Sequence, residues 1–204
     1  MDELISTAQI QTINSRYSNR LLVHGNSPLS LGWSDKTQQY QRFSRFLDII
    51  MRHSQPYSVL DIGCGFGDFA RFLEISKTPP KSYTGLDINN DLLEVARTAR
   101  YSFPAVFWCE NILEGDSFLR SDNPKYSFTI AAGLLNYNFH NSPEKMHEFA
   151  FAMIEKMLSL SAEYVIIDFI PTNRIDSYVP EPYIALYSIP EILSHLTRKG
   201  LMFT

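Results

Sequence analysis

Apolar residues fall along the chain in two alternating patterns, short continuous runs and longer stretches with a three- to four-residue repeat. The first pattern is typical of buried strands and the second of helices that cover a core. Their alternation favours an α/β fold, a doubly wound parallel sheet with helices on both faces, because parallel strands need crossover connections. The expected strands are residues 58–62, 83–88, 105–112, 129–132 and 164–170, and the expected helices are residues 37–53, 68–75, 142–160 and 188–199, with a further helix after residue 89.

Residues that favour helix ends mark several of these boundaries. Ser142 followed by Pro143 is typical of a helix start, with serine as the N-cap and proline in the first turn. Ser188 and Glu191 have the spacing of a capping box, and Gly200 predicts the end of the same helix.

The composition fits a single soluble domain, since 45% of the 204 residues are hydrophobic and 20% are charged. The net charge of -4 provides no basic field that would attract nucleic acid. No apolar run approaches the ~20 residues of a membrane span, and the first ten residues lack the pattern of a signal peptide. We therefore expect a cytoplasmic protein with neither a nucleic-acid nor a membrane partner.

Three alternate glycines, Gly63, Gly65 and Gly67, follow the first expected strand, and a helical pattern starts at Asp68. A strand, a tight turn and a helix start form the layout of a nucleotide-binding loop. A dinucleotide fingerprint needs a further glycine at position 68, and an acidic residue in the turn would repel a diphosphate. The sequence therefore disfavours a nicotinamide dehydrogenase. Asp61, two residues before the first glycine, suits a ligand with a positive end.

The pattern Asp61-x-Gly63-x-Gly65-x-Gly67 resembles motif I of the class I S-adenosylmethionine (SAM)-dependent methyltransferases, a Rossmann-like superfamily. SAM carries an ammonium and a sulfonium group and no phosphate, which agrees with the acidic residues. The resemblance implies SAM as the cofactor, S-adenosylhomocysteine as the product, and a mostly parallel sheet in the order 3-2-1-4-5. It also implies that the cofactor contacts Asp61, Gly63, Cys64, Gly65 and Gly67.

Asp87 ends the second expected strand, 20 residues after Gly67. An acidic residue in this place can accept hydrogen bonds from both ribose hydroxyls of an adenosine. We therefore expect Asp87 and the following Ile88 to contact the cofactor. The alternative for Asp87 is a simple turn or capping role.

Glu110, Asn111 and Ile112 end the third expected strand, where the resemblance implies contacts with adenine. The family commonly has an aspartate in place of Asn111, which holds the adenine amino group. Asn111 departs from that pattern, although its amide oxygen can accept the same hydrogen bond. Ile112 would pack on the adenine face. The alternative is that Asn111 caps the next turn.

The fourth expected strand ends at two small residues, Ala132 and Gly133, which would let a sulfonium and an acceptor approach the backbone. The family places the transferred methyl group at this strand end. Family members that methylate base amino groups often carry a proline-rich motif here, which this chain lacks, so that activity is disfavoured. Asn136 and Tyr137 could reach the acceptor or could pack on the core.

The segments at residues 32–34 and 41–43 look like an N-terminal helical lid found in some small-molecule members of the class. We expect Arg42 or Gln41 to hold the cofactor carboxylate and Trp33 to help close the site. A surface ion pair is the alternative for Arg42.

We expect one methyltransferase domain over residues 1–204, with a lid segment at 1–36 and a SAM-binding core at 37–204. Residues 201–204 could begin the sixth strand of the family fold, and none remains for the seventh. The C-terminal strands are therefore expected to be incomplete, either because the chain is truncated or because a second subunit completes them. A homodimer is expected if the apolar edge of the fifth strand is exposed.

A long loop at residues 171–187 follows the fifth expected strand and carries Tyr178, Tyr183 and Tyr187. These tyrosines could line an aromatic pocket or cover the core.

Cys64 and Cys109 would lie two strand spacings apart, about 9.6 Å, which is too far for a disulfide. Both are expected to be reduced thiols, as in the cytoplasm. The His and Cys residues show no ligand spacing, so no metal site is expected.

Together the motifs predict a SAM-dependent methyltransferase that acts on a small molecule. A protein or RNA methyltransferase and a non-catalytic SAM-binding protein remain alternatives. A general base is needed only for a poorly acidic or protonated nucleophile, and the candidate is His140, with His24, Tyr137 and Asp168 as weaker ones.

Overall fold

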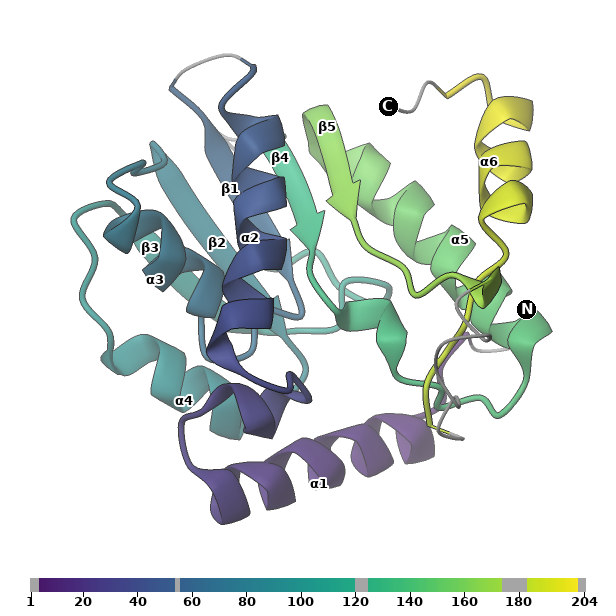
Figure 1. Ribbon diagram of the computed structural model, residues 1–204, viewed down its shortest axis with the longest axis horizontal. Coiled ribbons are helices and arrows are strands. Elements are labelled where there is room, and N and C mark those ends of the chain that lie inside the picture. The colour runs from purple at the N-terminus through teal and green to yellow at the C-terminus, as the bar shows by residue number, and fades with distance from the viewer. Residues whose placement is uncertain (1–3, 54–55, 120–124, 174–182, 202–204) are drawn as a thin grey trace.

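A single parallel sheet forms the centre of the protein. The computed structural model describes residues 4–53, 56–119, 125–173 and 183–201. Every pairing between its strands is parallel, and the strand order is β3-β2-β1-β4-β5. The predicted doubly wound sheet and its strand order are confirmed (Figure 1). The strands are β1 (Ser58–Ile62), β2 (Ser82–Asp87), β3 (Ala105–Cys109), β4 (Tyr126–Ala131) and β5 (Ser161–Ile167).

Helices cover both faces of this sheet (Figure 1). The helices α2 (Lys36–Ile50) and α3 (Asp68–Ile75) pack over one face, and α5 (Pro143–Leu160) packs over the other. The remaining α-helices are α1 (Thr7–His24), α4 (Asn90–Thr98) and α6 (Ile189–Arg198), and two 3-10 helices are η1 (Pro28–Leu31) and η2 (Leu134–Asn136).

Side chains alternate along the central strands and enter two separate cores. Val59 of β1 joins an aromatic cluster with Phe43 of α2 and Phe69 of α3. Leu60, the next residue, lies on the opposite face and belongs to the core that includes Met153 of α5. Because both faces of β1 are buried, the strand end that carries the glycines is held rigidly.

The fifth strand lies three residues earlier than predicted. β5 begins at Ser161, directly after α5, and ends at Ile167, whereas the apolar run had predicted residues 164–170. The next side chain, Asp168, leaves the sheet to accept a hydrogen bond from the Gly133 N–H at 2.7 Å. Phe169 lies outside the strand, but its side chain packs against the core that includes Met153 of α5. The apolar run therefore predicted the existence of the strand correctly and placed both of its ends three residues too late.

The capping box predicted for α6 does not form. Ser188 is the N-cap residue, but its side chain makes no capping hydrogen bond. The Glu191 carboxylate instead lies 3.6 Å from Nε2 of His147. Gly200, at φ +70°, follows the helix as predicted.

The N-terminal helix α1 lies across the carboxyl ends of the strands (Figure 1). It begins with a capping box, in which Ser6 Oγ accepts from the Gln9 N–H and the Gln9 side chain accepts from the Ser6 N–H. None of its side chains is fully buried, and it contacts η1 and α4. The N-terminal segment that was expected to form a helical lid therefore contains two helices, α1 and η1, among its described residues.

The sheet ends at β5 within the described residues, and Tyr164 on that strand is 37% exposed. The sixth strand that residues 201–204 were expected to begin falls almost wholly outside the described residues. Pairing of this edge with a second subunit stays a prediction. No helix in the described part of the chain is long and apolar enough to cross a membrane.

Candidate functional site

A cavity of about 820 Å³ lies between α1 and the carboxyl ends of the strands. Ligands bind in this place in doubly wound sheets, where the strand order reverses. Most of the residues predicted to contact a cofactor line it, namely Gly63, Gly65, Asp87, Ile88, Glu110, Asn111, Ile112, Ala132, Gly133 and Arg42. Asp61, Cys64, Gly67 and the predicted base His140 are absent from its lining.

Four backbone N–H groups of the glycine loop, including those of all three glycines, already donate to other groups of the protein. Those of Gly63 and Cys64 donate to the Leu86 carbonyl at 2.8 and 2.9 Å. The Gly65 N–H donates to Asp87 Oδ2 at 2.9 Å, and the Gly67 N–H donates to the Cys64 carbonyl at 2.9 Å. A phosphate-binding loop must point such donors at its ligand. This loop therefore suits a ligand without phosphate.

Two of the loop glycines are required by close approach of other segments. Gly63 has φ +71°, and a Cβ there would lie 2.7 Å from Leu134 Cδ1. Gly65 has φ +53°, and a Cβ there would lie 3.0 Å from Leu31 of η1. Both backbones favour glycine, and both neighbours line the cavity. The lid segment therefore packs directly on the glycine loop.

Asp87 stands where β2 meets the cavity, and its carboxylate also shapes the glycine loop. Besides the Gly65 N–H, it accepts the Asn89 N–H at Oδ1, at 2.9 Å. Burial raises the pKa of Asp87 above its ordinary value, and the hydrogen bonds from the backbone of Asn89, Gly65 and Ile88 oppose this rise. Each carboxylate oxygen can accept more than one hydrogen bond, so both remain able to receive a hydroxyl from the cavity.

Asp61 does not reach the cavity, contrary to its expected role. Strand alternation places it on the same face as Val59, under α2 and α3, where Tyr83 Oη donates to its carboxylate. Burial raises the pKa of Asp61 to about 7, the Tyr83 hydrogen bond lowers it, and Asp87 and Asp68 raise it further. Asp61 therefore acts within the core that supports the loop.

Cys64 and Gly67 also face away from the cavity. The Cys64 thiol folds back onto β2, where a Cβ on Gly85 would lie 2.7 Å from Sγ. Burial raises the pKa of Cys64 well above its ordinary value, so the thiol is unreactive. A Cβ on Gly67 would lie 3.0 Å from Phe107 and Tyr101. Both cysteines are free.

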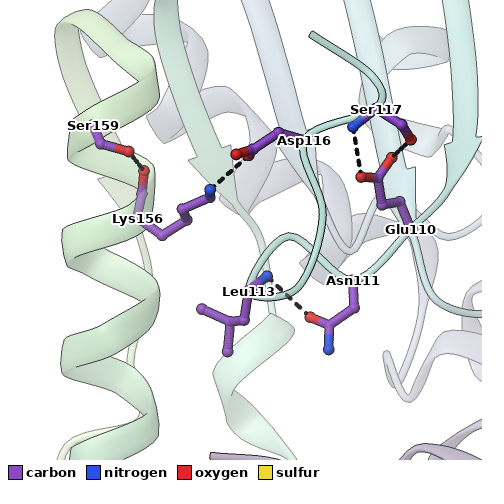
Figure 2. A network of polar contacts seen from close by, with 7 residues as sticks. All are labelled: Glu110, Asn111, Leu113, Asp116, Ser117, Lys156 and Ser159. Carbon is purple, nitrogen blue, oxygen red and sulfur yellow. Dashed lines mark hydrogen bonds and ion pairs between the residues drawn. The ribbon is translucent and has the colours of Figure 1, made fainter.

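The loop after β3 holds its own polar side chains in place (Figure 2). Glu110 accepts from the Ser117 N–H at 2.8 Å and from the Ser117 hydroxyl. Asn111 Oδ1 accepts from the Leu113 N–H at 3.1 Å. Asn111 is therefore a turn cap that also lines the cavity, which is the alternative that the sequence left open. Ile112 is buried at the same wall, at 3% exposure.

Lys156 of α5 fixes this loop from outside the cavity. Its Nζ donates to Asp116 Oδ1 at 2.6 Å (Figure 2). The ion pair joins the loop to the helix that covers one face of the sheet, so the loop's position follows from the fold.

Arg42 is paired with Asp168 while it lines the cavity. Its guanidinium bonds to Asp168 Oδ2 and lies 4.9 Å from the ring centre of Trp33. Asp168 Oδ1 accepts the Gly133 N–H, so one carboxylate joins α2 to the end of β4. Gln41, the other candidate for a carboxylate, is exposed and absent from the lining. Trp33 lies over Gly133, where a Cβ would be 3.2 Å from the indole.

His140 uses both ring nitrogens outside the cavity. Its Nε2 donates to the Leu4 carbonyl at 2.9 Å, so Nδ1 is the acceptor and receives the Gln9 amide at 3.0 Å. Burial lowers the pKa of His140. With its lone pair occupied, His140 is badly placed for a general base. His24 is exposed and also absent from the lining, whereas Tyr137 lines the cavity.

The tyrosines of the loop at 171–187 separate into different roles. Tyr183 lines the cavity. Tyr187 is fully buried, and its hydroxyl donates to the Leu135 carbonyl at 2.8 Å, so it covers the core. Tyr178 lies outside the described residues.

Sequence reasoning missed the inner face of α1. Six of its residues line the cavity, Ile10, Ile13, Asn14, Arg16, Tyr17 and Arg20. The signal was present, because Ile10, Ile13 and Tyr17 have helical spacing and follow the Ser6–Gln9 capping box. Asn14 Nδ2 also donates to the Ile88 carbonyl at 3.0 Å, which attaches α1 to the end of β2.

Comparisons with known proteins find similarity to methyltransferases in both sequence and structure. A family model described as a methyltransferase domain matches residues 59–159. No curated protein sequence matches the chain significantly. One similar solved structure is magnesium protoporphyrin IX methyltransferase from Synechocystis PCC 6803 with bound S-adenosylhomocysteine, at 18% identity and a TM-score of 0.65. The likeness covers 95% of this chain and 88% of that one.

Two further solved structures share the fold. The small RNA methyltransferase HEN1 is 19% identical with a TM-score of 0.59, over 79% of this chain and 21% of that one. The plantazolicin methyltransferase BpumL in complex with S-adenosylhomocysteine is 18% identical with a TM-score of 0.52, over 94% of this chain and 77% of that one. At these identities the likeness establishes a common fold.

Proposed function

We propose that this chain, which belongs to the class I SAM-dependent methyltransferases, binds SAM in the cavity beneath α1 and transfers its methyl group to a small molecule. One observation carries the cofactor assignment. Asp87 offers carboxylate oxygens to the cavity beside a glycine loop in which the N–H groups of all three glycines are already bonded. An adenosine without phosphate, joined to a positively charged end, has the complementary chemistry.

The lining residues support one placement of the cofactor. Asp87 accepts the ribose hydroxyls, and Ile88 and Ile112 pack on the adenine. The sulfonium lies near Ala132 and Gly133, where the small side chains leave room for it. The similar solved structures that contain S-adenosylhomocysteine agree with this class of ligand.

Arg42 holds the cofactor carboxylate in this proposal. It has to share its guanidinium with Asp168, which is its ion-pair partner. A guanidinium has five N–H donors, so it can keep one carboxylate and receive a second. Trp33, stacked against Arg42, then covers the methionine part of the ligand.

Methyl transfer follows from positioning. A lone pair on the acceptor attacks the methyl carbon in line with the carbon–sulfur bond, and the electrons of that bond stay on sulfur. The products are the methylated acceptor and S-adenosylhomocysteine, and an acceptor N–H or O–H loses its proton to solvent. Holding the two reacting atoms in line supplies much of the rate, so no protein base is required for an acidic acceptor.

A small acceptor fits a cavity of about 820 Å³ that α1 partly covers. The lid segment lies over the strand ends, and α1 attaches to β2 through Asn14. The net charge of -4 offers little attraction to a nucleic acid. The porphyrin and plantazolicin methyltransferases among the neighbours act on compounds other than nucleic acid, whereas the HEN1 neighbour acts on small RNA. RNA therefore stays as the second candidate.

Tryptophan fluorescence tests cofactor binding at the proposed place. The chain has two tryptophans, Trp33 in the cavity lining and Trp108 on β3, away from the lining. S-adenosylhomocysteine is expected to change the emission of the wild type and of Trp108→Phe and to leave Trp33→Phe unchanged. A response that disappears in Trp108→Phe instead would place the ligand elsewhere.

Labelled SAM separates the acceptor classes. The enzyme is incubated with methyl-labelled SAM and either the small-molecule or the RNA fraction of a cell extract. Transfer to the small-molecule fraction is expected. Transfer to RNA that weakens steeply with added salt would favour the second candidate, and binding of SAM without transfer to either fraction would favour a non-catalytic SAM-binding protein.

A further inference from the structure

Arg16 of α1 is held between two aromatic rings inside the cavity. Its guanidinium carbon lies 4.9 Å from the ring centre of Tyr137 and 4.6 Å from that of Tyr183. Cation–π contacts attract the guanidinium to both rings and restrict where it lies. They leave its N–H groups, which lie in the plane of the guanidinium, available to an acceptor of hydrogen bonds.

The three cations of the cavity lining differ in what they bind. Arg20 donates to the backbone carbonyls of Leu29 and Ser30. Arg42 is paired with Asp168. Arg16 has no carboxylate partner among the described residues, although it lines the cavity. Among the described residues, Arg16 is therefore the lining arginine that pairs with neither a carboxylate nor a backbone carbonyl, and its donors can serve a ligand.

The wall around Arg16 is assembled by three segments far apart in the sequence. The Asn138 N–H donates to the Tyr183 carbonyl at 2.8 Å, and the Ala185 N–H donates to the Asn136 carbonyl at 2.9 Å. Tyr17 of α1 meets Tyr137 edge to face, with ring centres 6.4 Å apart. These backbone bonds join the segment of Tyr137 to that of Tyr183, so the fold brings together the two rings that contact Arg16.

Most of the other side chains that α1 and the neighbouring segments contribute to the cavity are apolar. Ile10, Ile13, Phe139, Phe149 and Ile184 all line it. One polar exception is Asn136, whose buried Oδ1 has no hydrogen-bond partner in the structure. An apolar wall with one cation that can serve a ligand selects a hydrophobic molecule with a single anionic group.

We infer that the methyl acceptor is an apolar, ring-bearing molecule with a carboxylate, and that Arg16 binds this carboxylate. The inference rests on the proposed function and specifies its substrate class. The planar guanidinium matches a carboxylate with two parallel hydrogen bonds. The aromatic side chains Tyr17, Tyr137 and Tyr183 contact the ring system of the acceptor. Arg16 is a specificity-determining residue in this account.

Two matched probes test the inference on the full chain saturated with S-adenosylhomocysteine. Biphenyl-4-carboxylate has the inferred chemistry, and biphenyl-4-carboxamide is its neutral counterpart of the same shape. Calorimetry is expected to show at least about a tenfold preference of the wild type for the carboxylate, as a charge-assisted hydrogen bond supplies. Arg16→Gln should remove that preference, and Arg16→Lys should keep part of it.

Arg45→Gln is the matched control, because Arg45 is an exposed arginine on α2 outside the cavity lining. It should keep the full preference. Absence of a preference in the wild type, or the same preference in Arg16→Gln, overturns the inference.

Titration of the same variants with S-adenosylhomocysteine distinguishes failure of this inference from failure of the proposed function. Unchanged cofactor affinity in Arg16→Gln is expected and shows that the variant is folded. A tenfold loss would assign Arg16 to the cofactor carboxylate and overturn the inference, while the proposed function stands. A wild type that fails to bind S-adenosylhomocysteine would overturn both.

Discussion

Two aspartates at the ends of adjacent strands have opposite surroundings. Asp87 lies at the cavity and accepts two backbone N–H groups, whereas Asp61 lies in the core and accepts the Tyr83 hydroxyl. Sequence spacing alone predicted a cofactor contact for each. The difference arises because β1 directs Asp61 to the face under α3, which a motif without a strand register does not reveal.

Asp87→Asn should weaken binding of S-adenosylhomocysteine by about tenfold to a hundredfold, because hydrogen bonds to a charged group are worth about 1.5–3 kcal/mol. Calorimetric titration measures the change. Asp48→Asn removes an exposed carboxylate of α2 and should leave the affinity as in the wild type. Equal affinities of the two variants would exclude Asp87 from the ribose contact.

Asp61→Asn should change how stability depends on pH. Burial raises the pKa of Asp61 to about 7, against an ordinary value of 3.8, so the folded state keeps a proton that the unfolded state releases. Between these two pH values the unfolded state binds fewer protons, and the free energy of unfolding falls as pH rises. The loss from this group amounts to a few kcal/mol at most.

The variant lacks this titration and keeps an oxygen that can accept the Tyr83 hydroxyl. Chemical denaturation at pH 4 and pH 8 should show a smaller decline in the free energy of unfolding for Asp61→Asn than for the wild type. Parallel declines would mean that Asp61 ionises freely in the folded protein.

At the scale of elements, strands were easier to predict than the lid segment. Continuous apolar runs such as 58–62 can be buried on both faces only in the middle of a sheet, so the sequence determines them closely. α1 has no fully buried side chain, and its inner face mixes Ile10 and Ile13 with Asn14 and Arg16. A face that carries both apolar and polar lining residues has a less distinct periodicity than a core-facing helix.

Contact between the lid segment and β4 can be tested at Gly133. This residue has φ +77°, and a Cβ there would lie 3.2 Å from Trp33. Gly133→Ala should lose about 1 kcal/mol of stability through left-handed strain and should also displace Trp33. A weaker affinity for S-adenosylhomocysteine is therefore expected.

Gly200→Ala provides the matched comparison. Gly200 has φ +70°, and a Cβ there would meet nothing within 4 Å. It should lose similar stability, measured by thermal unfolding, and keep the cofactor affinity. If both variants bind S-adenosylhomocysteine equally well, Trp33 takes no part in closing the site.

At the scale of the whole molecule, the cavity lies where the strand order of the sheet predicts a ligand site. The order β3-β2-β1-β4-β5 reverses at β1 and β4, and the cavity lies beside their carboxyl ends. The resemblance to the methyltransferase class implied this order, and the glycines mark one of the strand ends. The sequence could not predict the cation between Tyr137 and Tyr183, since that arrangement requires three distant segments to meet.

Calorimetric titration of the full chain with SAM, S-adenosylhomocysteine and NAD tests the central claim most directly. The account predicts that both adenosyl-sulfur ligands bind with one site per chain and that NAD does not bind, because the N–H groups of Gly63, Cys64, Gly65 and Gly67 are bonded inside the protein and do not point at a diphosphate. Binding of NAD, or failure of both SAM and S-adenosylhomocysteine to bind, would contradict it.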